Sequence, residues 1–476
     1  MGSNSKHETV AAESGRITLE LPPKSLLESL GVDSSTLRSA LLDYKYQAPK
    51  LSFLETLCLD GFWDWLANRV YPNWLAPNML TLLGGACILS ATLLGAWFSP
   101  SLRGEAPSWV YATNALLLFA YQSLDGSDGK QARRTKTGSA LGELFDHGID
   151  AFAVAPITLF TIDAFAFGIE SVWPWLITLG AQACFLFSNL TLFHTGCMRV
   201  NPLDVIELQT AMYSSLLLTA IAGPGIWSLR IPLPLPTVSR VLFGLDWSLG
   251  IPIREGLGVW ILGVMAANAI QTTRTVWLHL IEHYDPSNPS YYPATTLDGV
   301  LISAARRVDP PCTGFRPLYK QLAYLFGHIT MTLLSYNAIV NTTAAAAATH
   351  QRPLLLLLLL NTTVGFAGEL LRLLANRVAR IPLPHPIVIK ETLTYGGKTV
   401  EGLTIEISRG LVGGLAFFVC ARMSGGTARY ALLSLVVGAV GLDAITFFAR
   451  STQAIAVVLG LHPFRVRGAK HWYKLE

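Results

Sequence analysis

The residues best suited to chemistry lie in the run LDGSDGKQARRTKTGSALGELFDHGID, which covers 124–150. Asp125 and Asp128 are three residues apart, a spacing that places both on one face of a helix. A second face follows at spacings of three, four and seven residues, and it holds Glu143, Asp146, His147 and Asp150. We expect a turn at 136–139 to join the two helices as antiparallel neighbours, so that both acidic faces meet at one end.

Four aspartates this close predict a divalent metal site. Ionised carboxylates repel one another unless cations neutralise them, and Mg²⁺ and Mn²⁺ are the hard cations that carboxylates select. Carboxylates on two helices can hold two such ions about 4 Å apart, the arrangement used for in-line displacement at phosphorus. The expected ligands are Asp125, Asp128, Asp146 and Asp150.

Three neighbours of these acids suit a phosphate-containing ligand. Gly129 and Gly142 lack side chains where a ligand or the other helix must approach closely. Arg133 offers a planar cationic fork for phosphate oxygens. The alternative is a solvated loop whose acids merely flank two membrane spans. Charges within the ends of apolar runs are costly and usually functional, which favours a site.

The rest of the chain predicts lipid as the main solvent. Of its 476 residues, 51% are hydrophobic and 14% are charged, whereas soluble domains carry about 25% charged residues. A span needs about 20 mostly apolar residues, so we expect an all-α, polytopic membrane helix bundle of about ten spans. The predicted spans are 78–98, 108–124, 140–166, 173–195, 206–226, 254–280, 319–341, 352–376, 408–423 and 428–449.

Five regions follow from this layout. They are a polar cytosolic segment at 1–48, an interfacial amphipathic helix at 49–75, a catalytic core at 76–226, additional transmembrane helices at 227–460 and a basic tail at 461–476. Within them, 1–20 is expected to be disordered, and the Pro- and Gly-punctuated run 380–406 to be a loop outside the bilayer. Three tryptophans in 51–75 suit rings at headgroup depth, the alternative being a soluble helix packed on the protein.

Charge and cysteine usage exclude other classes. The net charge is +4 without a long basic stripe, so nucleic-acid binding is not expected. Six scattered cysteines without a CxxC pair predict neither a disulfide framework nor a zinc site.

Basic residues occur between two spans and after the last one, at Arg133, Arg134, Lys136, Arg465, Arg467, Lys470 and Lys474. The positive-inside rule makes that side, with both termini, cytosolic.

The acidic segment resembles the signature of the CDP-alcohol phosphotransferases, D-x-x-D-G-x-x-A-R, eight residues, G-x-x-x-D-x-x-x-D. All eight fixed positions are met, by Asp125, Asp128, Gly129, Ala132, Arg133, Gly142, Asp146 and Asp150. The ELFDHGID run, Pro77-Asn78 with Thr81, and the span layout are similar to the eukaryotic choline and ethanolamine phosphotransferases. The strong match covers about thirty residues, and the span layout extends it loosely over most of the chain.

The resemblance implies transfer of phosphocholine or phosphoethanolamine from CDP-choline or CDP-ethanolamine to diacylglycerol, with release of CMP. It implies two Mg²⁺ or Mn²⁺ ions held by Asp125, Asp128 and Asp146, with Asp150 completing the site. It also implies an endoplasmic reticulum or Golgi membrane. The implied nucleotide-binding residues are Asn78, Gly129, Ala132, Arg133 and Gly142.

The acceptor hydroxyl needs a general base, and three candidates stay open. The resemblance favours Asp150. Glu143 and His147 stand at i and i+4, so a carboxylate-oriented imidazole is a physical alternative. All three lie on the expected second helix.

One stretch departs from the family. A W-E-x-Y-x-T-G run is expected after the fourth span; His194, Thr195 and Gly196 match, but the Trp-Glu is absent. The head group and lipid acceptor therefore stay open, as do acyl preference and oligomeric state, a homodimer included.

The competing hypotheses are an ion-coupled transporter, since intramembrane acids also bind ions, and a non-catalytic scaffold. The glycine, alanine and arginine frame of the signature favours the enzyme.

Overall fold

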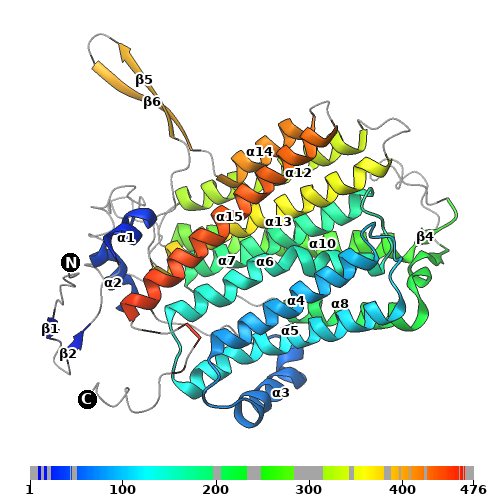
Figure 1. The fold of residues 1–476 in the computed structure, drawn as a ribbon, viewed down its shortest axis with the longest axis horizontal. Coiled ribbons are helices and arrows are strands. Elements are labelled where there is room, and N and C mark those ends of the chain that lie inside the picture. The colour runs from blue at the N-terminus through cyan, green and yellow to red at the C-terminus, as the bar shows by residue number, and fades with distance from the viewer. Residues whose placement is uncertain are drawn as a thin grey trace.

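Ten long helices run side by side in the part of the chain that the computed structural model describes (Figure 1). They are α4 (Pro77–Phe98), α5 (Ser108–Thr135), α6 (Ala140–Ala164), α7 (Val172–Thr195), α8 (Val205–Ala222), α10 (Ile253–Glu282), α12 (Phe315–Asn341), α13 (Ala348–Ala379), α14 (Arg409–Ala421) and α15 (Gly426–Leu459). The described residues are 9–11, 16–18, 23–42, 44, 51–196, 205–232, 248–282, 315–341, 348–379, 388–395, 398–406, 409–422, 426–459, 461, 463–464 and 466.

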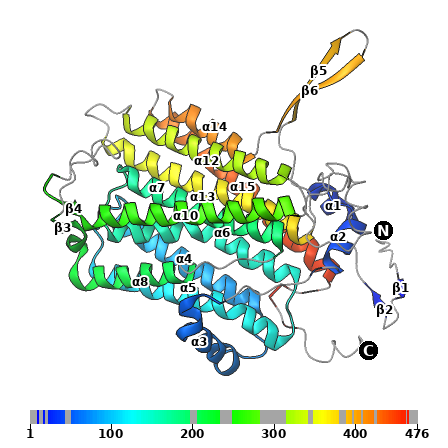
Figure 2. The same ribbon diagram turned by 180° about the vertical axis from the view of Figure 1, so that it is seen from behind.

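These helices confirm the all-α bundle. Each predicted span lies on one of them, although α5 and α15 continue well beyond the predicted ends at 124 and 449. Within the described ranges, seven helices are long and apolar enough to cross a membrane, namely α4, α6, α7, α8, α10, α13 and α15. α5, α12 and α14 lie among them (Figures 1 and 2). The chain is therefore a multi-pass helical membrane protein.

Local signals set the helix ends around the acidic segment. Pro77 occupies the first turn of α4, where its missing N–H costs nothing. α5 ends where Lys136 adopts a left-handed backbone with φ of 55°. The Ser139 side chain accepts a hydrogen bond from the Gly142 N–H at 3.3 Å and caps α6. The predicted turn at 136–139 is confirmed.

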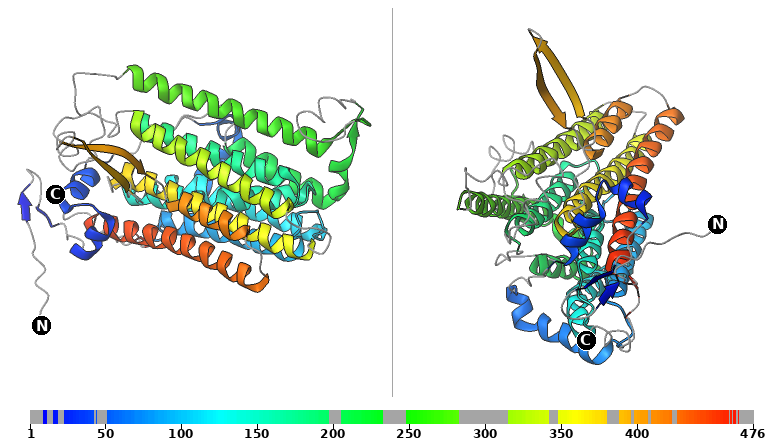
Figure 3. Two further views of the ribbon diagram at one scale, coloured as in Figure 1. Left: turned by 90° about the horizontal axis from the view of Figure 1, so that it is seen from above. Right: turned by 90° about the vertical axis from the view of Figure 1, so that its left-hand side faces the viewer.

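α6 contributes side chains to two separate apolar clusters, one of them the largest. Its Leu141, Leu144 and Ala151 pack with residues of α7, α12, α13 and α15 and with the short helices α1 (Lys24–Leu30) and α2 (Ser34–Leu42). Its Ala153 and Phe160 pack with α4, α5 and α8. The end-on and top views in Figure 3 show the helices stacked with nearly parallel axes. Any residue on α6 is thus held from both sides.

A helical segment between residues 55 and 70 lies outside the bundle, against α5 (Figures 1 and 2). It comprises a π-helical turn at Glu55–Leu59, α3 (Asp60–Trp65) and a second π-helical turn at Leu66–Val70. Trp63 is buried against α5, while apolar side chains nearby are exposed, namely Leu51, Phe53, Leu57, Trp65, Val70 and Trp74. The segment is helical as predicted, and its interfacial location stays a prediction.

The described strands form three two-stranded antiparallel sheets. They pair β1 (Thr9–Ala11) with β2 (Arg16–Thr18), β3 (Arg230–Ile231) with β4 (Ile251–Pro252), and β5 (Val388–Tyr395) with β6 (Lys398–Glu406). Hairpin β5–β6 projects from the bundle (Figure 1), so the loop predicted at 380–406 was wrong for these strands. Their β-branched residues favour extended structure. The disorder predicted at 1–20 was likewise wrong at β1 and β2.

Candidate active site

Three predicted metal ligands converge where α5 meets α6. Carboxylate oxygens of Asp125, Asp128 and Asp146 all lie within 4.8 Å of one another. Oδ1 of Asp125 and Oδ1 of Asp146 are buried and have no hydrogen-bond partner among the described residues. Buried carboxylates are unfavourable unless a cation balances them. An all-oxygen donor set of this kind fits a hard divalent cation.

A third helix, α4, also shapes this site. We expected α5 and α6 to be neighbours, but each packs more extensively against α4 than against the other. From α4, the Thr81 hydroxyl donates a hydrogen bond of 2.5 Å to Oδ2 of Asp128. This bond fixes the orientation of one carboxylate, so Thr81 supports the donor set without belonging to it.

Asp150 lies one turn beyond Asp146 and has partners of its own. Its Oδ1 accepts a hydrogen bond from the Tyr121 hydroxyl, and its Oδ2 lies 3.8 Å from Nδ1 of His147. Nδ1 of His147 is buried with no hydrogen-bond partner in the described chain. The three-carboxylate cluster does not include Asp150, and its role as a further ligand stays a prediction.

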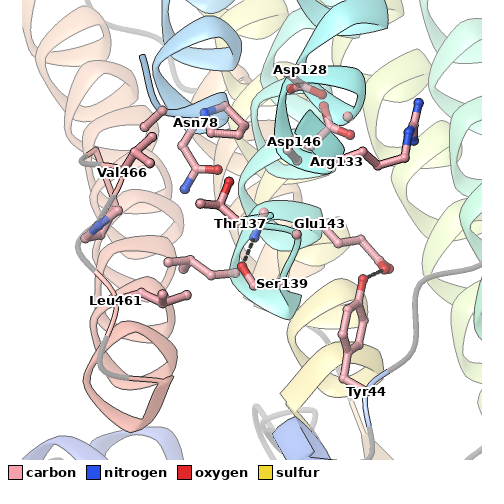
Figure 4. A pocket seen from close by; sticks show the side chains of 18 residues that line it. Tyr44, Asn78, Asp128, Arg133, Thr137, Ser139, Glu143, Asp146, Leu461 and Val466 are labelled. Carbon is pink, nitrogen blue, oxygen red and sulfur yellow. Dashed lines mark hydrogen bonds between the residues drawn. The ribbon is translucent and has the colours of Figure 1, made fainter. Parts of the chain in front are cut away.

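A pocket with about 160 Å³ of water-accessible space opens beside the aspartates (Figure 4). Asp128, Asp146 and Glu143 form part of its wall. All five residues predicted to contact the nucleotide line it as well, namely Asn78, Gly129, Ala132, Arg133 and Gly142. Residues that are far apart along the chain thus surround one cavity next to the donor set.

Gly129 and Gly142 leave space for a ligand rather than for a helix. A Cβ added at Gly129 would meet only the Arg133 Nη1, at 3.7 Å. One at Gly142 would come no closer than 3.8 Å, to the Asn78 Oδ1. Of the two reasons expected for these glycines, the structure favours the open pocket.

Glu143 is held by two residues that the sequence did not single out. Its carboxylate forms an ion pair with Arg377 of α13 and accepts a hydrogen bond from the Tyr44 hydroxyl (Figure 4). These two contacts hold the Glu143 carboxylate, whereas Nδ1 of His147 lies near Asp150, so the expected Glu143–His147 pair does not hold either side chain among the described residues. Glu143 lies in the wall of the pocket with its charge already balanced.

The stretch that departs from the family ends α7. His194 is fully buried, and Gly196 closes the helix with a left-handed φ of 75°. The Arg377 Nε donates a hydrogen bond of 3.2 Å to the carbonyl oxygen of Leu192. Arg377 therefore contacts both this stretch and Glu143.

Several site residues were missed by sequence reasoning. Tyr121 precedes Asp125 by four residues, so helical spacing alone could have placed it on the acidic face. Arg377 lies near the end of an apolar run, a position that is usually functional. Tyr44 and the C-terminal residues of the pocket wall offered no local signal; the latter are Leu461, Pro463 and Val466. The predicted basic residues Arg465, Arg467, Lys470 and Lys474 lie outside the described residues.

Comparison with known proteins agrees with this geometry. Residues 74–252 match the family model described as CDP-alcohol phosphatidyltransferase, and this segment contains all eight signature residues. Residues 74–252 are thus similar to that family, which confirms the resemblance.

The curated relatives cover the same part of the chain. Cholinephosphotransferase 1 of Danio rerio is 39% identical over 194 residues, which are 40% of this chain and 50% of the relative. The Homo sapiens protein of that name is 37% identical over 193 residues, 40% of this chain and 47% of the relative. An uncharacterized class-I CDP-alcohol phosphatidyltransferase family protein of Dictyostelium discoideum is 34% identical over 194 residues, which are 41% of this chain and 50% of the relative. The chain spans about half the length of these relatives.

Proposed function

We propose that this chain transfers phosphocholine or phosphoethanolamine from a CDP-alcohol to diacylglycerol and releases CMP. The observation that carries the proposal is the pocket, whose wall combines the predicted nucleotide contacts with Asp128 and Asp146 of the carboxylate cluster. The names of the Danio rerio and Homo sapiens relatives favour choline as the head group. A transporter would need the acids but not the open glycine positions beside them.

The residues of the pocket suit a nucleotide diphosphate. The missing side chain of Gly129 and the small methyl of Ala132 let the nucleotide lie against α5, with Asn78 of α4 in the same pocket wall for the cytidine. Arg133 is exposed at the rim, where its guanidinium can reach phosphate oxygens as the substrate enters. Mg²⁺ or Mn²⁺ ions at Asp125, Asp128 and Asp146 would supply the positive charge that neutralises the phosphates.

We assign the general base to His147, with Asp150 orienting its imidazole. Of the three candidates, Glu143 is engaged by Arg377 and Tyr44, and Asp150 by Tyr121. The diacylglycerol oxygen attacks the phosphorus that carries the head group, and the hydroxyl proton passes to His147. The bond between that phosphorus and the bridging oxygen breaks, and its electron pair leaves with CMP.

The lipid acceptor reaches this site from the bilayer. The pocket lies at the end of the bundle where α5 ends and α6 begins, so a hydroxyl at headgroup depth arrives beside the acids. The basic turn after α5 supports a cytosolic location for this end by the positive-inside rule. An endoplasmic reticulum or Golgi membrane is the proposed location.

The test is an assay of the purified full chain with radiolabelled CDP-choline and CDP-ethanolamine, each with diacylglycerol and Mg²⁺ or Mn²⁺. We expect equal amounts of CMP and labelled phospholipid, and the ratio of the two rates identifies the head group. CMP without phospholipid would point to another acceptor. No CMP from either donor would contradict the proposal.

A further inference from the structure

Glu143 is connected to two parts of the chain that lie outside the matched family segment. That segment ends at residue 252, yet the Glu143 carboxylate pairs with Arg377 and accepts a hydrogen bond from Tyr44. The Glu143 side chain is 2% exposed and the Arg377 side chain 10%. The charge of each residue is therefore balanced inside the protein rather than by solvent.

Arg377 links α6, which lines the pocket, to α7. It lies in the last turn of α13 and bonds the Leu192 carbonyl near the end of α7. It also pairs with Glu143, which lies in the first turn of α6. Removing one partner of a buried ion pair leaves the other charge uncompensated, so this contact strongly restricts where α6 begins.

The position of Glu143 makes this restriction relevant to the site. One turn further along α6 come Asp146, in the metal-ligand cluster, and His147, the proposed base. A rigid helix transmits a shift of its first turn to the next one. Side chains in a site must be held to within about 0.5 Å to be productive.

We propose that Arg377 is a positioning residue for the active site. Through its ion pair with Glu143 it holds the first two turns of α6 in place, and Tyr44 supports the same carboxylate from the N-terminal segment. The additional C-terminal helices thereby contribute directly to catalysis by the family segment. The inference rests on the proposed function.

A second buried arginine of α13 offers a matched control. Arg372 pairs with Asp443 of α15, and its side chain is 4% exposed. This pair lines a different cavity, between α13, α14 and α15, together with small residues such as Gly365 and Gly413. Substituting Arg372 removes a comparable buried charge from the same helix without touching the pocket.

The experiment compares the purified full-length variants Arg377→Met, Arg377→Lys, Tyr44→Phe and Arg372→Met with the unchanged protein. Thermal unfolding, kcat and the KM for CDP-choline are measured for each. We expect Arg377→Met to lower kcat about 10- to 100-fold with KM changed less than about threefold, because a small misplacement of reacting groups costs rate. Arg377→Lys keeps the charge but not the fork and should recover part of the rate.

The control and the double variant separate positioning from general destabilisation. Arg372→Met should lose thermal stability as Arg377→Met does, but keep kcat within about threefold. In a Glu143→Gln background, Arg377→Met should cause little additional loss of kcat, since the proposed effect of Arg377 on the site passes through its contact with Glu143. If the losses of kcat caused by Glu143→Gln and Arg377→Met multiply in the double variant, the inference is overturned. A loss of kcat in Arg372→Met equal to that in Arg377→Met would also overturn it.

Failure of the inference is distinguishable from failure of the proposed function. If the unchanged protein releases no CMP from either CDP-alcohol, both are wrong. If it is active and Arg377→Met keeps kcat within about threefold, only the positioning role is wrong. Should Arg377→Met not fold, Arg377→Lys and Tyr44→Phe carry the same comparison, because both retain most of the packing.

Discussion

At the scale of single residues, the converging aspartates predict that activity depends on a divalent cation. Asp125, Asp128 and Asp146 hold buried oxygens close together, and none of the three carboxylates forms an ion pair with a basic side chain among the described residues. Changing any one of the three to Ala should abolish turnover, and excess chelator should do the same to the unchanged protein. Radiolabelled product formation with and without added Mg²⁺ measures both effects.

Asp163 provides the control for these substitutions. It is buried in α6, the helix of Asp146, but hydrogen bonds from Ser99, the Gly104 N–H and Tyr111 satisfy its carboxylate at 2.6, 3.0 and 3.2 Å. Asp163→Asn should lower stability and leave the metal dependence unchanged. Full turnover in excess chelator would show that the chemistry needs no metal, and normal rates in all three aspartate variants would place the metal elsewhere.

The proposed base makes a second prediction at this scale. His147→Ala should lower kcat by about 10² to 10⁴, the usual contribution of a general base, while CDP-alcohol binding persists. Single-turnover rates and equilibrium binding of CDP-choline measure the two separately. If His147→Ala is mild and Asp150→Asn is inactive with normal metal affinity, Asp150 is the base instead.

A third residue-scale prediction concerns the open glycine of the pocket. Gly129→Leu should fold normally, because an added Cβ meets only the flexible end of Arg133, and Leu has the higher helix propensity. Its side chain would occupy space proposed for the nucleotide, so the KM for the CDP-alcohol should rise at least about tenfold, as expected from overlap with a bound ligand. An unchanged KM would exclude nucleotide binding along this face of α5.

At the scale of elements, Gly126 and Gly129 lie about one turn apart on α5 but serve different purposes. Gly129 leaves space for a ligand, whereas Gly126 allows another helix to pack closely. A Cβ at Gly126 would lie 2.6 Å from the Trp63 ring, so this glycine lets α3 dock on α5. Gly126→Leu should destabilise the protein by about 1–3 kcal/mol, the cost of overpacking, and expose α3 to limited proteolysis. Gly263→Leu on α10, where an added Cβ meets nothing within 4 Å, is the control. Equal stability of both variants would contradict the docking.

At the scale of the whole molecule, the pocket end of the bundle should face the cytosol. Thr137 follows α5 at that end, and Arg103 precedes α5 at the other. With the exposed Cys58 replaced by Ser, a cysteine at Thr137 should react with an impermeant thiol reagent only from the cytosolic side. A cysteine at Arg103 should react only from the opposite side. The reverse pattern would invert the topology inferred from the basic turn.

Much of this protein was determined by the sequence alone. The ten long helices could be predicted because an apolar run of about 20 residues is a local property that lipid enforces. The acidic faces could be predicted because helical spacing depends only on neighbours within a few residues. For the same reason Asp125, Asp128 and Asp146 were identified together, and the turn before Ser139 was placed correctly.

Only the tertiary structure decided how the site is closed and supported. Tyr44 and Glu143 are 99 residues apart along the chain, and Arg377 is on a helix outside the family segment. No periodic pattern records such contacts, because they depend on how whole helices pack against one another rather than on the spacing within one. Packing likewise placed α4 against both acidic helices. It also decided that Gly129 leaves space for a ligand, while Gly126 lets α3 pack on α5. Because an unpaired charge is costly in the protein interior, a buried Glu143 needs a positively charged partner. Which residue is that partner depends on how the helices pack.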